Sequence, residues 1–184
     1  YRTVPPCTRD IQKNVLETAP TMTPSDFPEG YRPQRQLGEG SMGQVWLART
    51  QETGSHCAVK ILNLRRDRRG SAERSFNREV RAMARLDHPG IIQVHDFGRT
   101  SEGSPFVAME YVSGSALNPY MRGIWTWPRL WTLLDGLLSA LGHAHARELI
   151  HRDLKPGNVI VLPDRVGVGA IKLADFGIAL GISD

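Results

Sequence analysis

The chain has 184 residues, and 23 lysines and arginines against 19 acidic residues give a formal net charge of +4. This length favours one domain of ordinary size and excludes two large ones. Hydrophobic residues at 40% and charged residues at 23% exclude a wholly disordered chain. The positive charge is too mild to support nucleic-acid binding, so we expect a folded domain without nucleic acid among its partners.

The two cysteines, Cys7 and Cys57, lie far apart. Their spacing fits neither a metal site nor a disulfide framework. No uncharged apolar run reaches about eighteen residues, so no membrane segment is expected in this piece. The beginning of the chain also does not have the pattern of a signal peptide. These features predict a cytoplasmic protein.

Residues 1–30 are rich in threonine and proline and show little apolar periodicity, so we expect a disordered tail there. A strand is expected from Tyr31 to Leu37, and a glycine turn joins it to a second strand at Val45–Ala48. A third strand, Cys57–Leu62, carries a single lysine. Because side chains alternate along a strand, Ala58 and Lys60 are expected to share one face.

A helix is predicted from Ser71 to about Leu86, with Phe76, Val80 and Met83 as its apolar stripe. Glu79 lies three residues after Phe76 and four before Met83. Helical spacing therefore puts a carboxylate on the buried side. Such a charge needs a partner.

Two further strands, Ile91–Phe97 and Pro105–Val112, bring the first half to five strands and one helix. This pattern predicts an α+β fold in which one helix packs on an antiparallel sheet. The second half is expected to begin with a long helix, Trp127–Arg147, and to continue with two short strands, Val159–Leu162 and Ile171–Ala174. The apolar stripe expected on the long helix consists of Leu130, Leu134, Leu137, Leu138, Leu141 and His145.

Gly38, Gly40 and Gly43 form a G-x-G-x-x-G pattern between two predicted strands. Glycines let backbone N–H groups approach phosphate oxygens without an intervening side chain. A dinucleotide-binding turn would be followed by a helix, whereas here a strand follows. A plain glycine hairpin is the alternative reading of this pattern.

The loop from His151 to Asn158 carries Asp153, Lys155 and Asn158, and the sequence Asp-Phe-Gly follows at 175–177. This loop offers a base, a cation and a metal-binding amide within one turn. Phosphoryl transfer requires these three kinds of group. The number and order of these residue types make this the strongest functional signal in the chain.

From Tyr31 to Gly177 the sequence resembles the eukaryotic-type protein kinases, including their bacterial Ser/Thr members, with the motifs in the family's order. The resemblance implies a five-stranded N-lobe with its hinge at residues 31–113. It also implies a partial, mainly helical C-lobe at 114–184, truncated after Asp-Phe-Gly. The implied activity is transfer of the ATP γ-phosphoryl group to Ser or Thr hydroxyls of a protein substrate. We expect the 184 residues alone to be inactive.

The resemblance assigns roles in catalysis to individual residues. Lys60 would hold the α and β phosphates and pair with Glu79, and Asp153 would accept the proton of the substrate hydroxyl. Lys155 would contact the transferred phosphate, which favours Ser and Thr substrates. Asn158 and Asp175 would bind Mg²⁺.

The resemblance also assigns nucleotide-binding and packing residues. The three glycines of the pattern would cover the ATP phosphates, and the backbone at Glu110 and Val112 would contact adenine. Met83, Val94, His151 and Phe176 would stack as an apolar column across the two lobes. The walls of the adenine slot would come from Leu37, Val45, Ala58, Met109 and Ile160.

Two other functions compete with this one. A pseudokinase or nucleotide-binding scaffold would keep the fold without transferring phosphate, but nothing in the sequence favours it. The residues expected for transfer are all present: Lys60, Glu79, Asp153, Asn158 and Asp175. A small-molecule phosphotransferase of the aminoglycoside or choline kinase type shares the Asp and Asn loop. Arg152, where those enzymes usually carry glycine, weighs against the second alternative.

In the kinase family an arginine at this position commonly receives an activating phosphate.

Overall fold

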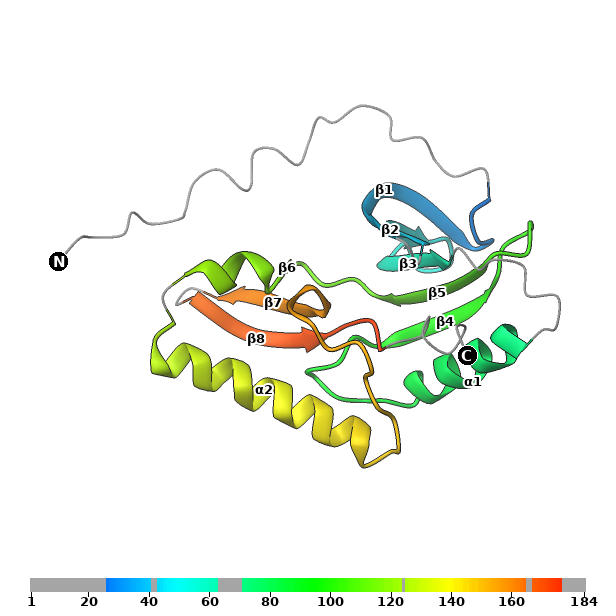
Figure 1. Cartoon of the computed structure of the whole chain (residues 1–184). Helices are drawn as coiled ribbons and strands as arrows, with labels where there is room; N and C mark the ends of the chain where they lie inside the picture. Colours follow the sequence, from blue (N-terminus) through cyan, green and yellow to red (C-terminus); the bar gives the residue numbers. More distant parts are fainter. Residues whose placement is uncertain (1–25, 41–42, 63–70, 124, 165–166, 177–184) are drawn as a thin grey trace.

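The computed structural model describes residues 26–40, 43–62, 71–123, 125–164 and 167–176. Its first half is a five-stranded antiparallel sheet in the order β1-β2-β3-β5-β4 (Figure 1). The α+β fold and the five-stranded sheet predicted from the sequence are confirmed. The strands are β1 (Tyr31–Gly40), β2 (Gly43–Thr50), β3 (His56–Leu62), β4 (Val94–Arg99) and β5 (Pro105–Glu110).

Alternation along β3 produces two apolar faces. Val59 and Ile61 pack in one hydrophobic cluster with Trp46 and Phe106, while Leu62 packs in the larger core. Ala58 and Lys60 share the second face, because residues two apart in a strand point to the same side. The division of β3 between the two clusters therefore agrees with the predicted common face of these two residues.

Helix α1 (Ser71–Met83) lies against β4 (Figure 1). Its predicted stripe is buried, with Phe76, Val80 and Met83 exposed by 2%, 0% and 7%. The helix ends three residues earlier than predicted, because the N–H of Leu86 bonds to the carbonyl of Met83 at 2.9 Å in a closing turn.

The segment between α1 and β4 joins the two halves of the molecule. The N–H of Ile92 donates to the carbonyl of Leu173 at 2.9 Å, and the N–H of Leu173 donates to the carbonyl of Gly90 at 2.8 Å. Residues 90–92 therefore pair with Leu173 of the second half, and the fourth strand begins at Val94 instead of the predicted Ile91. The core is continuous across both halves, since Val107 and Val80 pack in the same cluster as Leu173.

The second half is built on a three-stranded sheet, ordered β6-β7-β8, that the long helix covers (Figure 1). The hairpin of β7 and β8 connects the predicted catalytic loop, which ends at Asn158, to the segment that carries Asp175. None of the described helices is long and apolar enough to cross a membrane. The elements are β6 (Ser115–Ala116), the 3₁₀ helix η1 (Asn118–Arg122), α2 (Trp127–His145), the 3₁₀ helix η2 (Pro156–Asn158), β7 (Val159–Asp164) and β8 (Gly167–Leu173).

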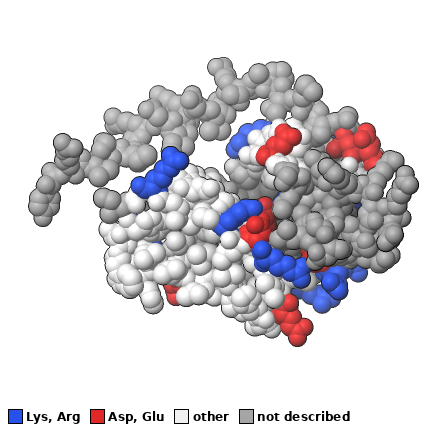
Figure 2. Space-filling view, viewed as in Figure 1, with Lys and Arg blue, Asp and Glu red and all other residues white. Residues whose placement is uncertain are grey.

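Helix α2 is apolar on two faces, and the described residues bury one of them. The buried seam runs through Leu133, Ala140 and Ala144. The predicted stripe is wrong at Leu134 and Leu138, which are 38% and 68% exposed, and at His145, which is also exposed. Trp127 and Trp131 continue the exposed face. Figure 2 shows few charged side chains over this part of the surface.

Asp26, Phe27 and Pro28 contact the first sheet or its loops and are not part of a tail. Pro28 is fully buried, and the ring of Phe27 meets Trp46 edge to face with centroids 6.2 Å apart. The carboxylate of Asp26 accepts hydrogen bonds from Ser101 and from the N–H of Glu102. The rest of the predicted tail lies outside the described residues.

Glycine is required at Gly43 by the backbone. Its φ of +134° is rarely adopted by L-residues, and an added Cβ would lie 2.0 Å from the carbonyl oxygen of Ile61. An added Cβ at Gly38 meets nothing within 4 Å. The fold therefore requires glycine at the last position of the pattern, Gly43, whereas Gly38, the first, has room for a side chain.

We predict that Gly43→Ala lowers the free energy of unfolding by about 1–3 kcal/mol, because the new side chain forces strain into the β2–β3 pairing. Gly38→Ala is the matched control and should stay within about 0.5 kcal/mol of the parent. Urea denaturation of the complete protein measures both changes. Equal losses in the two variants would contradict this reading of the hairpin.

Candidate active site

A cleft of about 480 Å³ lies where the two halves meet, within the usual size range of small-molecule sites. Its walls come from the first sheet, from the connection after β5 and from the β7–β8 hairpin. Most of the residues predicted for nucleotide binding line it. They are Leu37, Gly38, Val45, Ala58, Met109, Glu110, Val112 and Ile160, and Asp175 lies at the same cleft.

Six other lining residues were not predicted: Arg35, Ile92, Tyr111, Gly114, Gly157 and Ala174. Gly114 could have been identified from the sequence, because it is a glycine two residues after the predicted fifth strand. A Cβ at this position would lie 2.6 Å from the carbonyl oxygen of Val161. The close approach of these two backbone segments therefore needs glycine. Ile92 enters the cleft because its segment pairs with Leu173, a long-range contact that no local pattern indicates.

Lys60, like Gly40 and Gly43, is not among the lining residues, but it reaches the cleft through its contact with Asp175. Lys60 is 6% exposed, and its Nζ lies 2.7 Å from Oδ1 of Asp175. Burial of a lone ammonium is costly, so the carboxylate is required as its counter-charge. Asp175 has a φ of 53°, and backbone strain of this kind is concentrated at functional sites. The predicted meeting of these two residues at one site therefore agrees with the geometry.

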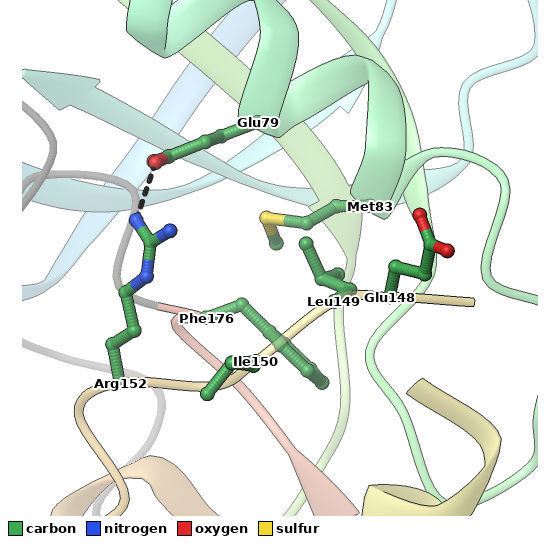
Figure 3. Close-up of a pocket in the computed structure, with 7 residues that line it drawn as sticks. All are labelled: Glu79, Met83, Glu148, Leu149, Ile150, Arg152 and Phe176. Carbon is green, nitrogen blue, oxygen red and sulfur yellow. Dashed lines mark hydrogen bonds and ion pairs between the residues drawn. The ribbon is translucent and has the colours of Figure 1, made fainter. Parts of the chain in front are cut away.

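Glu79 does not pair with Lys60, so that part of the prediction is wrong. Its Oε1 instead accepts a hydrogen bond from Nη1 of Arg152 at 2.8 Å. Figure 3 shows the Arg152 side chain reaching from its loop to Glu79 on α1. Helical spacing correctly placed a carboxylate on the inner side of α1, but an arginine from the second half satisfies it, because Lys60 is already bound to Asp175.

The Glu79–Arg152 pair closes one end of a small pocket of about 70 Å³. Met83 and Phe176 form its apolar floor, and Glu148 and Ile150 complete its rim (Figure 3). Arg152 has a φ of 60°. The arginine is thus held in an uncommon backbone conformation beside a carboxylate of α1.

The loop after His151 places two polar side chains, those of Lys155 and Asn158, around Asp153. Oδ2 of Asp153 accepts hydrogen bonds from Nζ of Lys155 at 2.7 Å and from Nδ2 of Asn158 at 3.0 Å. The lysine, followed by the amide of Asn158, lowers the pKa of the Asp153 carboxyl. Asp153 is therefore a carboxylate at neutral pH. Its pairing stabilises the fold above the ordinary carboxyl pKa and is lost as the pH falls through the lowered value.

His151, at the start of this loop, is buried and contacts the Ala174–Phe176 segment. It is 2% exposed, its Nε2 lies 3.0 Å from the carbonyl oxygen of Ala174, and its ring lies 4.5 Å from that of Phe176. Burial lowers the pKa of the imidazole. Met83, Val94 and Phe176 line one further cavity, so the four residues of the predicted apolar column are in fact close together.

The oxygen ligands predicted for Mg²⁺ lie on adjacent segments. The N–H of Ala174 donates to the backbone carbonyl of Asn158 at 2.8 Å, which sets Asn158 beside Asp175. Nδ2 of Asn158 is bonded to Asp153, so Oδ1 is the amide atom that a cation would use. No group of three or more His, Cys, Asp or Glu in the described ranges could hold a metal. Phosphate oxygens and water would have to complete the coordination, as is common for Mg²⁺.

The chain that forms this cleft and its lysine–aspartate pair is similar to known proteins. The sequence profile described as "Protein kinase domain" matches residues 31–184. The chain is 41% identical over 153 residues to Serine/threonine-protein kinase pkn3 of Myxococcus xanthus, covering 81% of this chain and 28% of that protein. It is 38% identical over 158 residues to Serine/threonine-protein kinase PknA of Mycobacterium tuberculosis, covering 83% of this chain and 36% of that protein.

Among solved structures, the PknI kinase domain of M. tuberculosis superimposes with a TM-score of 0.70 at 34% identity. The match covers 82% of this chain and 59% of that one. This chain therefore spans about a third of the length of the curated relatives and somewhat more than half of that kinase domain. The chain belongs to the protein kinase domain family, within which its relatives are bacterial Ser/Thr kinases.

The coupling energy between Glu79 and each candidate partner can be measured with double-mutant cycles on the free energy of unfolding, without nucleotide. We predict a coupling of about 0.5–1 kcal/mol between Glu79→Gln and Arg152→Gln, a modest value because the arginine side chain is 51% exposed. The cycle of Glu79→Gln with Lys60→Met should give a coupling near zero. The opposite ranking of the two cycles would contradict the observed pairing.

Proposed function

We propose that the complete protein transfers the γ-phosphoryl group of ATP to Ser or Thr hydroxyls of a protein substrate. One observation carries the proposal: Lys60 of the first sheet binds Asp175, which lines the cleft, and the Asp153–Asn158 loop is bonded to the same segment through Asn158 and Ala174. Family membership with bacterial Ser/Thr kinases supports it.

Adenine would lie between Val45 and Ala58 on one side and Ile160 on the other, with the backbone at Glu110 and Val112 at its edge. Gly38 and Gly40 present open backbone, since an added Cβ at either position meets nothing within 4 Å. The glycine backbone can therefore approach phosphate oxygens. Gly43 serves the hairpin itself.

Mg²⁺, held by Asn158 and Asp175, would neutralise charge on the phosphates during transfer. Lys60 would hold the α and β phosphates in place of its present carboxylate partner. Asp153 would orient the substrate hydroxyl and take up its proton as the new O–P bond forms. Its lowered pKa makes it a weak base, so orientation is its larger contribution. Lys155 would place positive charge beside the transferred group.

The described arrangement corresponds in this proposal to a resting state. Kinase catalysis requires the lysine of the third strand to pair with the glutamate of the helix. Here Lys60 binds Asp175 and Glu79 binds Arg152. A phosphate added to the chain beyond Phe176 would compete with Glu79 for Arg152, because a phosphate is the stronger partner for a guanidinium. Glu79 would then be free to move to Lys60.

The cytoplasm is the proposed location, because ATP is abundant there and Cys57, a buried free thiol, needs no disulfide partner. Protein substrates, and no nucleic acid, are the proposed partners. The mild net charge of +4 supports this choice.

We predict that Asp153→Asn lowers kcat for phosphorylation of a Ser- or Thr-containing protein by about 10²- to 10⁴-fold, because the hydroxyl loses its base and its orientation. Asp135→Asn removes the same charge from an exposed site on α2 and is the control, with kcat unchanged. Radiolabelled phosphate transfer by the complete protein measures both. Absence of turnover in the parent would favour the pseudokinase, and preference for choline or an aminoglycoside would favour a small-molecule phosphotransferase.

A further inference from the structure

An ion pair behind the cleft connects the hinge to the strand that leads to Asp175. Oε2 of Glu110, the last residue of β5, accepts a hydrogen bond from Nζ of Lys172 on β8 at 2.7 Å. The same oxygen lies 3.3 Å from the N–H of Gln93, and the N–H of Glu110 donates to the carbonyl of Gln93 at 2.8 Å. Three segments that are distant in sequence are fixed to one another through one glutamate.

This pair is partly withdrawn from water. The Lys172 side chain is 16% exposed and the Glu110 side chain 31%. Pairs of this kind hold geometry more firmly than exposed pairs do, and loss of one partner leaves the other charge without its counter-charge. Lys172 has no role in the site described above, and its pairing needs an explanation of its own.

The two ends of the pair belong to the two ends of the proposed nucleotide site. Glu110 lines the cleft at the end proposed for adenine. Lys172 pairs with Ile160 in the β7–β8 hairpin, and Asp175, three residues further on, binds Lys60. A nucleotide with its Mg²⁺ must contact both ends at once, so the separation between them affects its binding. A ligand that contacts the adenine end alone is indifferent to that separation.

We propose that Lys172 is a positioning residue that sets the distance between the adenine-binding hinge and the metal-binding segment through Glu110. This proposal rests on the proposed nucleotide site. It makes a selective claim, because the pair should matter for MgATP, which spans both ends, and not for adenosine, which reaches only one.

Equilibrium dissociation constants of MgATP and adenosine, measured by calorimetry on the complete protein, test this claim. Lys172→Met should weaken MgATP about fivefold to tenfold and change adenosine less than twofold. Lys172→Arg, which keeps the charge, should restore MgATP binding to within about twofold of the parent. Arg32→Met removes one positive charge from an exposed position on β1 and should alter neither constant.

Glu110→Gln keeps the hinge backbone and the side-chain shape, and provides a second route if Lys172→Met does not fold. It should reproduce the selective loss for MgATP. Equal weakening of MgATP and adenosine, or no change in either, would overturn the positioning role while leaving the proposed function intact. A parent protein that binds neither ligand would overturn the proposed function itself.

Discussion

The ion pair between Lys60 and Asp175 is the interaction on which the site depends. The two residues are 115 positions apart in the sequence, and the lysine is almost completely removed from solvent. A buried ammonium needs an anionic partner, so the sheet that carries Lys60 and the segment that carries Asp175 must stay together. The backbone hydrogen bonds of Leu173 with Gly90 and Ile92 hold the same junction. The cleft exists because this junction brings its walls to one place.

Six charged groups near the cleft satisfy one another in three pairs. Lys60 with Asp175, Arg152 with Glu79 and Lys155 with Asp153 each lie within 2.8 Å. In the proposed function, MgATP would separate the first pair by supplying a cation for Asp175 and phosphates for Lys60, so the opposite charges of the ligand replace those of the protein. The same residues then serve both states, and the exchange of partners avoids leaving a charge unpaired.

Several parts of the fold and site could be predicted because they depend on local rules. Strand alternation placed Ala58 and Lys60 on one face, and the spacing of Asp153, Lys155 and Asn158 within one loop indicated their cluster. The partner of Glu79 could not be predicted in this way, because helical spacing gives the side of a helix and not the cation that reaches it. The kinase resemblance supplied a pairing that this arrangement does not have.

Other differences also come from long-range packing. Helix α2 is apolar on two faces, so its periodicity could not decide whether Leu133 or Leu134 is buried. The Lys172–Glu110 pair and the packing of Phe27 on Trp46 involve residues far apart in sequence, and no local pattern indicates them. Composition alone placed residues 26–30 in a tail, although three of them make specific contacts with the first sheet or its loops.

The dependence of ATP affinity on Mg²⁺ tests the central claim most directly, because it reports whether Asp175 and the phosphates share one cation beside Lys60. ATP binding to the complete protein should be measured with and without Mg²⁺, in the parent and in Asp175→Asn. The account predicts that Mg²⁺ tightens binding in the parent and that the tightening disappears in Asp175→Asn. An equal effect of Mg²⁺ on both proteins would contradict it.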